Sequence, residues 1–214
     1  MYFRSLIAVA LASIAGISVA GSSQAATAEG LVAVHSRHLD ELYVRPDANL
    51  AAYRKVLIDP VRVGFHRDWL RYGYTANPAR PVGEDNVRRI VGGIAGDAQA
   101  SIAEAFKARG YEIVTVPGPG VLRLSPAIAD LYVNAPDRHS PWREKAFTRE
   151  AGQAVLLLDA TDSVSGTLLG RVAHRGVAEQ MGRFARANDV SNRFWFDALI
   201  RRWAVSCAAE LGPH

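Results

Sequence analysis

The stretch from Asp85 to Gly110 repeats apolar residues at helical spacing, and this pattern predicts one long helix. Charged side chains fall on the opposite face, which is typical of a helix that packs one side against a sheet. Asp85 is suited to cap the N-terminus, and Gly110 to end the helix in a left-handed conformation. Gly92 and Gly96 lie on or beside the apolar stripe, so we expect a close approach to a sheet there. The stripe consists of Val87, Ile90, Val91, Ile94, Ala98, Ile102, Ala105 and Phe106.

Runs rich in β-branched and aliphatic residues surround this helix and predict strands. Residues 153–159 are apolar on both faces, which favours a central position in a sheet. The run over residues 121–134 loses its alternation near Pro126 and Asp130, which indicates an edge strand or a bulge. The remaining runs cover residues 111–116, residues 168–175, which form a hairpin with 153–159, and residues 55–65, which Pro60 interrupts.

The elements follow one another in the order β-α-β-β-β-α and predict an α+β fold. We expect a two-layer sandwich in which two main helices cover a mixed or antiparallel sheet of about four to five strands. Residues 29–40 are expected to form a short helix or an irregular lead-in. The second helix spans residues 190–211, and its apolar face carries Phe196, Ile200, Trp203 and Cys207.

Residues 1–25 have the pattern of a secretory signal peptide. Arg4 is their only charge, a run of small and apolar residues extends from Leu6 to Val19, and Ala25 supplies a small residue for cleavage. This run is shorter than the roughly 20 apolar residues that a membrane-spanning helix needs. We therefore predict cleavage after Ala25 and export to the periplasm, with residues 26–214 as a single domain. An uncleaved N-terminal anchor is the alternative.

Cys207 is the only cysteine in the sequence. A disulfide within the chain is therefore excluded, and the hydrophobic core has to stabilise the fold. The formal net charge of +4 is small, and acids and bases are interspersed, so we expect no nucleic-acid partner. No later apolar run is long enough to cross a bilayer, so we expect no transmembrane span.

Four segments occur in a characteristic order: YRKVLIDPVRV, FKARGYEIVTVPGPGVLRLSPAIADL, QAVLLLDATDSVSGTLLGRVAHRG and FDALIRRWA. Together they resemble the bacterial domain-of-unknown-function family 3313, whose members are mostly described as envelope lipoproteins. The resemblance implies a periplasmic or outer-membrane setting in a Gram-negative bacterium, and it implies no established activity and no catalytic residues. The chain departs from the lipoprotein pattern because it lacks the lipid-acceptor cysteine.

We expect no metal and no cofactor. His35 and His38 stand three residues apart, but zinc needs three or four such ligands and no second cluster joins them. Asp159 and Asp162 begin a turn that lacks the further acids of a calcium loop. The sequence contains neither a G-x-S-x-G elbow nor a phosphate loop, and Cys207 on an apolar helix face is expected to be buried and unreactive.

The segment from Phe65 to Tyr74 is the candidate partner-binding site. It interleaves Arg67 and Arg71 with Trp69 and Tyr72 in a loop between a strand and the long helix. Arginine and aromatic side chains dominate the energetics of binding surfaces. The alternative is that these aromatic side chains pack on the core beneath the loop, since large exposed aromatic patches are uncommon.

The functional expectation is a non-enzymatic periplasmic protein that binds an envelope protein or an anionic envelope component. The alternative is a small cell-wall hydrolase or transferase whose catalytic acids the sequence does not single out. A structural subunit of a larger assembly is a third interpretation. Carboxylates or histidines that converge in a cleft would favour the enzyme.

Overall fold

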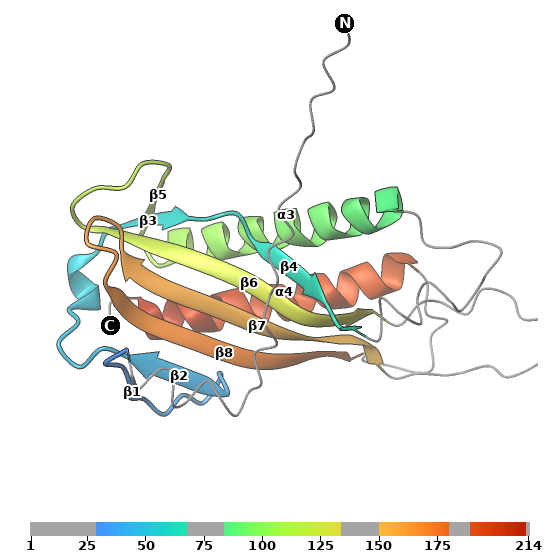
Figure 1. Ribbon diagram of the computed structural model, residues 1–214, viewed down its shortest axis with the longest axis horizontal. Helices are drawn as coiled ribbons and strands as arrows, with labels where there is room; N and C mark the ends of the chain where they lie inside the picture. The colour runs from blue at the N-terminus through green and yellow to red at the C-terminus, as the bar shows by residue number, and fades with distance from the viewer. Residues whose placement is uncertain (1–28, 68–83, 134–149, 180–188, 213–214) are drawn as a thin grey trace, which may run out of the picture.

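The computed structural model describes residues 29–67, 84–133, 150–179 and 189–212, and Figure 1 shows their arrangement. The predicted signal peptide lies outside the described residues. In chain order the elements are β1 (Val32–Ala33), β2 (Glu41–Val44), the short 3-10 turn η2 (Leu50–Ala52), β3 (Lys55–Ile58), β4 (Arg62–Phe65), α3 (Glu84–Ala108), β5 (Glu112–Val114), β6 (Val121–Val133), β7 (Glu150–Asp162), β8 (Leu168–Glu179) and α4 (Asp189–Leu211).

The strands of the described part form one 8-stranded mixed sheet in the order β1-β2-β8-β7-β6-β3-β5, with β4 beside β6. β3 is parallel to β5 and β6, β4 is parallel to β6, and the other neighbours are antiparallel. The α+β class, the mixed sheet and the two main helices are confirmed, whereas the expected number of four to five strands was too low. β1 and β2 form where no strand was expected, and the run over residues 55–65 divides into two strands.

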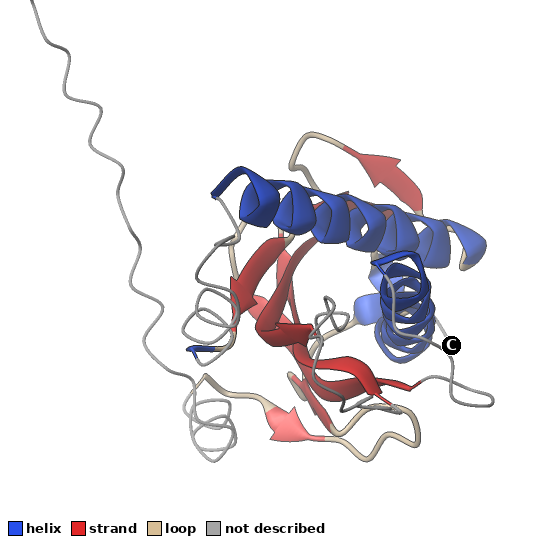
Figure 2. Ribbon diagram, turned by 90° about the vertical axis from the view of Figure 1, so that its right-hand side faces the viewer, coloured by secondary structure: helices blue, strands red, loops and turns tan. Residues whose placement is uncertain are grey.

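Both helices lie on the same face of the sheet (Figures 1 and 2). α4 packs on β7 and β8, α3 packs on β3, β4 and β5, and the two helices contact each other along the layer. Aliphatic side chains that alternate along the strands fill the space between the layers, and Leu122, Leu124, Leu156 and Leu158 are completely buried. The expected two-layer sandwich is therefore present.

The chain leaves the sheet between β3 and β4, at Asp59-Pro60, and then returns to the same side of β6. β3 pairs with β6 as far as Leu124, and β4 pairs with it from Ala127 onward. Pro126 has no N–H to donate and lies in β6 opposite this gap. β6 is therefore a central strand with a bulge near Asp130, whose φ is 49°. The expected bulge is confirmed, and the edge position was wrong.

The close approaches of a helix to the sheet are made by α4, at glycines of β7 and β8, and not by α3. A Cβ added to Gly92 or Gly96 of α3 would meet no atom of the described chain within 4 Å, so the expected close contact there was wrong. A Cβ at Gly176 of β8 would lie 2.7 Å from Leu199 Cδ2, one at Gly170 would lie 2.9 Å from Leu211 Cδ2, and one at Gly152 of β7 would lie 2.7 Å from Phe196 Cζ. β8 thus admits α4 because two of its inward positions carry no side chain.

A carboxylate ends the pairing along the outer edge of β8. β2 covers this edge only from Gly170 to Ala173. At the next paired position, Oδ2 of Asp40 accepts a hydrogen bond from the backbone N–H of Arg175 at 2.7 Å. The same oxygen lies 3.2 Å from Nδ1 of His174. The side chain of Asp40 therefore stands where the carbonyl of a longer neighbouring strand would lie.

α4 buries the apolar face that the sequence predicts. Phe196 and Ile200 are buried, and Trp203 and Cys207 retain only 2% and 1% of their surface exposed. Burial, with a smaller contribution from Glu210, raises the pKa of the Cys207 thiol well above its usual value. Cys207 is therefore a structural residue, because the reactive thiolate is scarce at neutral pH.

Trp203→Ala should lower the free energy of unfolding by about 3–5 kcal/mol, because it leaves a large cavity between α4 and the sheet. Cys207→Ala removes less volume and should cost less. Denaturant unfolding of the two variants measures both effects. Rapid labelling of native Cys207 by a bulky thiol reagent would contradict the burial.

Candidate functional site

The face of the sheet opposite the helices is open in the described part of the chain (Figures 1 and 2). Of the described residues, only the segment around Leu31 lies over this face, at one margin, where Leu31 packs on Tyr43 of β2. Alternate residues of β4, β6, β7 and β8 point to this face, since their neighbours along each strand point into the core. We call it the open face.

An apolar patch occupies the middle of the open face. Ala127, Leu157 and Ala173 face one another across β6, β7 and β8, and Ala129 pairs with Val155 in the adjacent row. All five side chains are half-buried. β7 is thus apolar on both faces, as the sequence predicts for a covered central strand, yet the helices cover only one of these faces.

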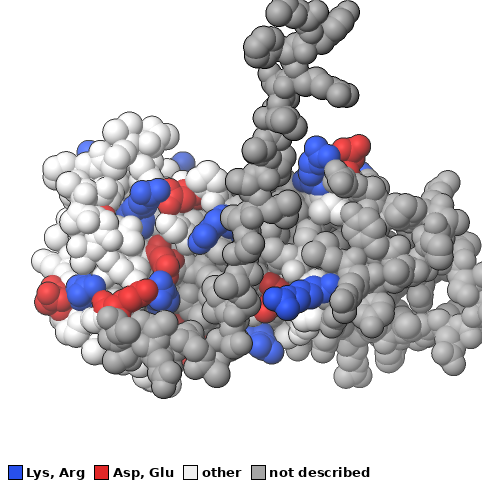
Figure 3. Space-filling view, viewed as in Figure 1, with Lys and Arg blue, Asp and Glu red and all other residues white. Residues whose placement is uncertain are grey.

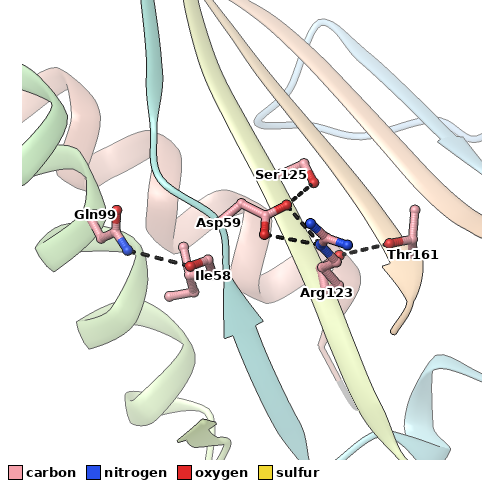
Figure 4. A network of polar contacts seen from close by, with 6 residues as sticks. All are labelled: Ile58, Asp59, Gln99, Arg123, Ser125 and Thr161. Atoms are coloured by element: carbon pink, nitrogen blue, oxygen red, sulfur yellow. Dashed lines mark hydrogen bonds and ion pairs between the residues drawn. The ribbon is translucent and has the colours of Figure 1, made fainter. Parts of the chain in front are cut away.

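A network of polar contacts borders this patch at the gap between β3 and β4 (Figure 4). Nε of Arg123 donates to both carboxylate oxygens of Asp59 at 3.0 and 2.9 Å, and the hydroxyl of Ser125 donates to Asp59 Oδ2 at 2.6 Å. Partial burial raises the pKa of Asp59, but the hydrogen bonds from Arg123 and Ser125 and the charge of Arg62 outweigh burial and lower it.

A second ion pair continues this border across the sheet. Ser125 pairs with Asp159 of β7, which pairs with Arg171 of β8. Arg171 donates to both oxygens of Asp159, at 2.7 and 2.9 Å, and its Nη1 lies 2.8 Å from Oε2 of Glu29. Hydrogen bonding and the charge of Asp159 raise the pKa of Arg171 against its burial. The residues of the polar row are Glu29, Asp59, Arg123, Ser125, Asp159 and Arg171.

Two shallow hollows of similar size lie on the described surface. One, of about 480 Å³, lies between Lys55 and the loop after β5. The other, of about 470 Å³, contains Tyr53 and Asp162. Burial and the hydrogen bond that the Tyr53 hydroxyl donates to Asp162 at 2.9 Å raise the pKa of Tyr53 to about 12. Asp162 also accepts hydrogen bonds from two backbone N–H groups of the turn between β7 and β8. Together the two side chains hold this turn against the segment that carries Tyr53.

The lining of the first hollow contains no acid or histidine. The second is lined by two acids, Asp47 and Asp162, and Asp162 is held there by Tyr53 and by its own turn. Over the described ranges, no three His, Cys, Asp or Glu side chains approach closely enough to hold a metal ion. No helix in these ranges is long and apolar enough to cross a membrane.

The predicted partner-binding segment is described only in part. Arg67 is its last described residue and lies two positions after the end of β4, whereas Trp69, Arg71 and Tyr72 lie outside the described residues. The ring of the neighbouring His66 packs edge-on against Tyr132 of β6, with centroids 6.3 Å apart. β4 therefore holds the start of this segment against the sheet.

The polar row was not predicted from the sequence. Its members come from separate segments, and only the folded sheet brings them together. A signal was nevertheless present. Arg123 and Ser125 alternate with apolar residues in β6, which is typical of side chains on the solvent face of a strand, and Asp59 precedes a strand-breaking proline.

These features define a two-layer α+β protein with one open sheet face. The chain matches the family described as "Protein of unknown function (DUF3313)" over residues 21–206 and belongs to this family. The resemblance found in the sequence is thereby confirmed. No curated protein matches the chain.

Several solved structures are similar to this chain. The PelC dodecamer from Paraburkholderia phytofirmans has a TM-score of 0.38 and 12% identity, covering 82% of this chain and 94% of that chain. A DUF330 protein from Xanthomonas campestris has a TM-score of 0.40 and 9% identity, covering 77% and 90%. A neuraminyllactose-binding hemagglutinin homolog from Helicobacter pylori has a TM-score of 0.35 and 13% identity, covering 77% and 86%.

Asp59→Asn should destabilise the protein at neutral pH and have little effect in acid. The pKa of Asp59 is lowered in the folded state, so its carboxylate contributes stability above the carboxyl pKa of the unfolded chain, about 3.9. This contribution is lost as the pH falls through the lower pKa of the folded state. Thermal unfolding between neutral pH and strong acid should show the two melting curves converging. A constant difference would contradict the assignment.

Proposed function

We propose that this protein is a non-enzymatic interaction protein of the bacterial cell envelope, exported by residues 1–25. The open face is its principal interaction surface. One observation carries this proposal: β7 presents Val155 and Leu157 to a face that no described element covers beyond its margin. Soluble proteins rarely leave contiguous apolar patches exposed unless something binds there.

The polar row suits the border of such a surface. Asp59 and Asp159 are each held by an arginine, so their charges are fixed in position before a partner arrives. A partner then meets an ordered rim around an apolar centre, which is the usual anatomy of a protein interface. Figure 3 shows acidic and basic groups side by side on this face.

The alternative of a cell-wall hydrolase or transferase has less support. It requires carboxylates positioned for proton transfer, and Asp59 and Asp159 of the open face are paired with arginines instead. An arginine partner lowers the pKa of a carboxyl group, whereas a general acid needs a raised one. Asp59 shows the lowering.

A photoreactive residue in place of Leu157 tests the proposal in cells. We expect it to crosslink the protein to another macromolecule, because Leu157 lies at the centre of the apolar patch. The matched control replaces Val205, an aliphatic residue of α4 that is 53% exposed. Mass spectrometry identifies the products. Equal crosslinking at both positions, or none at Leu157, would overturn the proposal.

The segment that follows β4 is proposed as a second contact site, for an envelope protein or an anionic envelope component. Arg67 and Arg71 can pair with phosphate or carboxylate groups, and Trp69 and Tyr72 add apolar area with a polar edge. The alternative, that the aromatic side chains cover the core, predicts a different response to mutation.

Arg67→Ala/Arg71→Ala and Trp69→Ala should reduce the recovery of crosslinked partners and leave the melting temperature nearly unchanged. Thermal unfolding and crosslinking of the same preparations measure the two effects. A large fall in melting temperature for Trp69→Ala, with no effect of the arginine pair on crosslinking, would show that this segment is core cover.

A further inference from the structure

We propose that the open face binds the open face of a second copy of this chain, so that two sheets pack against each other and the helices form the outer layers. This inference rests on the proposed function, because it names the partner of the same surface. Four observations support it: the apolar patch, the balance of charge around it, the size of the face, and the small side chains at its centre.

The charges around the apolar patch favour a partner of mixed charge. Acids and bases are equally represented there, so a uniformly acidic or basic partner would place like charges against half of them. A second copy carries the same mixture, and a two-fold axis brings each residue opposite a different one. The bases are Arg62, Arg123, Arg171 and Arg175, and the acids are Glu29, Glu41, Asp59 and Asp159.

The size of the face matches what a stable dimer needs. β6, β7 and β8 have 13, 13 and 12 residues, and β4 extends the sheet beside β6. With a rise of about 3.3 Å per residue and a strand spacing of about 4.8 Å, these three strands and the 4 residues of β4 present roughly 670 Å², within the roughly 600–1,000 Å² that each partner of a standard interface buries. A specific interface of standard size buries about 800 Å² on each partner.

The shape of the apolar patch favours a sheet over a membrane. Ala127, Ala129 and Ala173 are small and half-buried, so they form a low floor above which only Val155 and Leu157 of the patch rise. Insertion into a lipid surface relies on protruding apolar or aromatic side chains, which this floor lacks. Two flat sheets instead approach to about 10 Å and interdigitate their facing side chains. Val155 and Leu157 are the larger members that would fill the layer between them.

The dimer is tested with purified protein by sedimentation or light scattering over a dilution series. We expect the wild type to dimerise and Leu157→Glu to weaken dimerisation about 100-fold or more, because the glutamate would be buried without a partner. The matched control, Val205→Glu, adds the same charge to the helix layer and should dimerise normally. Circular dichroism verifies that both variants fold.

A second measurement avoids relying on a disruptive variant. Leu157→Cys should form a covalent dimer with a short bis-maleimide, whereas Val205→Cys should not. The native Cys207 does not need to be replaced, because it is only 1% exposed and should not react with the maleimide. A wild type that stays monomeric throughout, or a dimer unaffected by Leu157→Glu, would overturn the inference.

The outcome in cells separates this inference from the proposed function. A crosslink from position 157 to a second copy supports both. Crosslinks only to a different protein, or to lipid, leave the proposed function standing and refute the dimer. The absence of any product that exceeds the Val205 control refutes both.

Discussion

The fit of α4 against β8 is the contact on which the rest of the fold depends. Gly170 and Gly176 leave room for the helix, and Leu199 occupies the space that a side chain at Gly176 would take. The apolar face of α4 then covers β7 and β8, while α3 covers β3, β4 and β5. With both helices on one side, the described part of the chain leaves the other side of the sheet uncovered beyond its margin.

The break at Asp59-Pro60 serves both structure and surface. It allows β3 and β4 to pair one after the other with β6. It also accommodates Pro60 and Pro126, which lie on the two sides of the gap and cannot donate hydrogen bonds to the sheet. It also releases the carboxylate of Asp59 from the ladder, where Arg123 and Ser125 bind it. A local irregularity of the backbone thus places a charged group at the border of the apolar patch.

Much of this fold could be predicted from the sequence, because its long elements carry strong periodicity. The helix from Asp85, the final helix with Trp203 and Cys207, and the central hairpin all follow from the spacing of apolar residues. The short strands β3, β4 and β5 lie within runs that were predicted as strands, whereas β1 and β2 were missed, since two and four residues carry too little pattern and depend on their neighbours for pairing. The polar row was missed because its residues are distant in sequence: Asp59 and Arg123 are 64 residues apart and meet only through the register of the sheet.

The carboxylate of Asp40 has a consequence for how these sheets can associate. A strand edge with unsatisfied N–H and C=O groups invites another chain to extend the sheet, which leads to open-ended growth. Asp40 occupies the N–H of Arg175, so a foreign strand arriving at this position meets a negative charge and finds no donor. Lateral addition is discouraged along this part of β8, and contact between sheets is directed to their faces, where association closes after two copies.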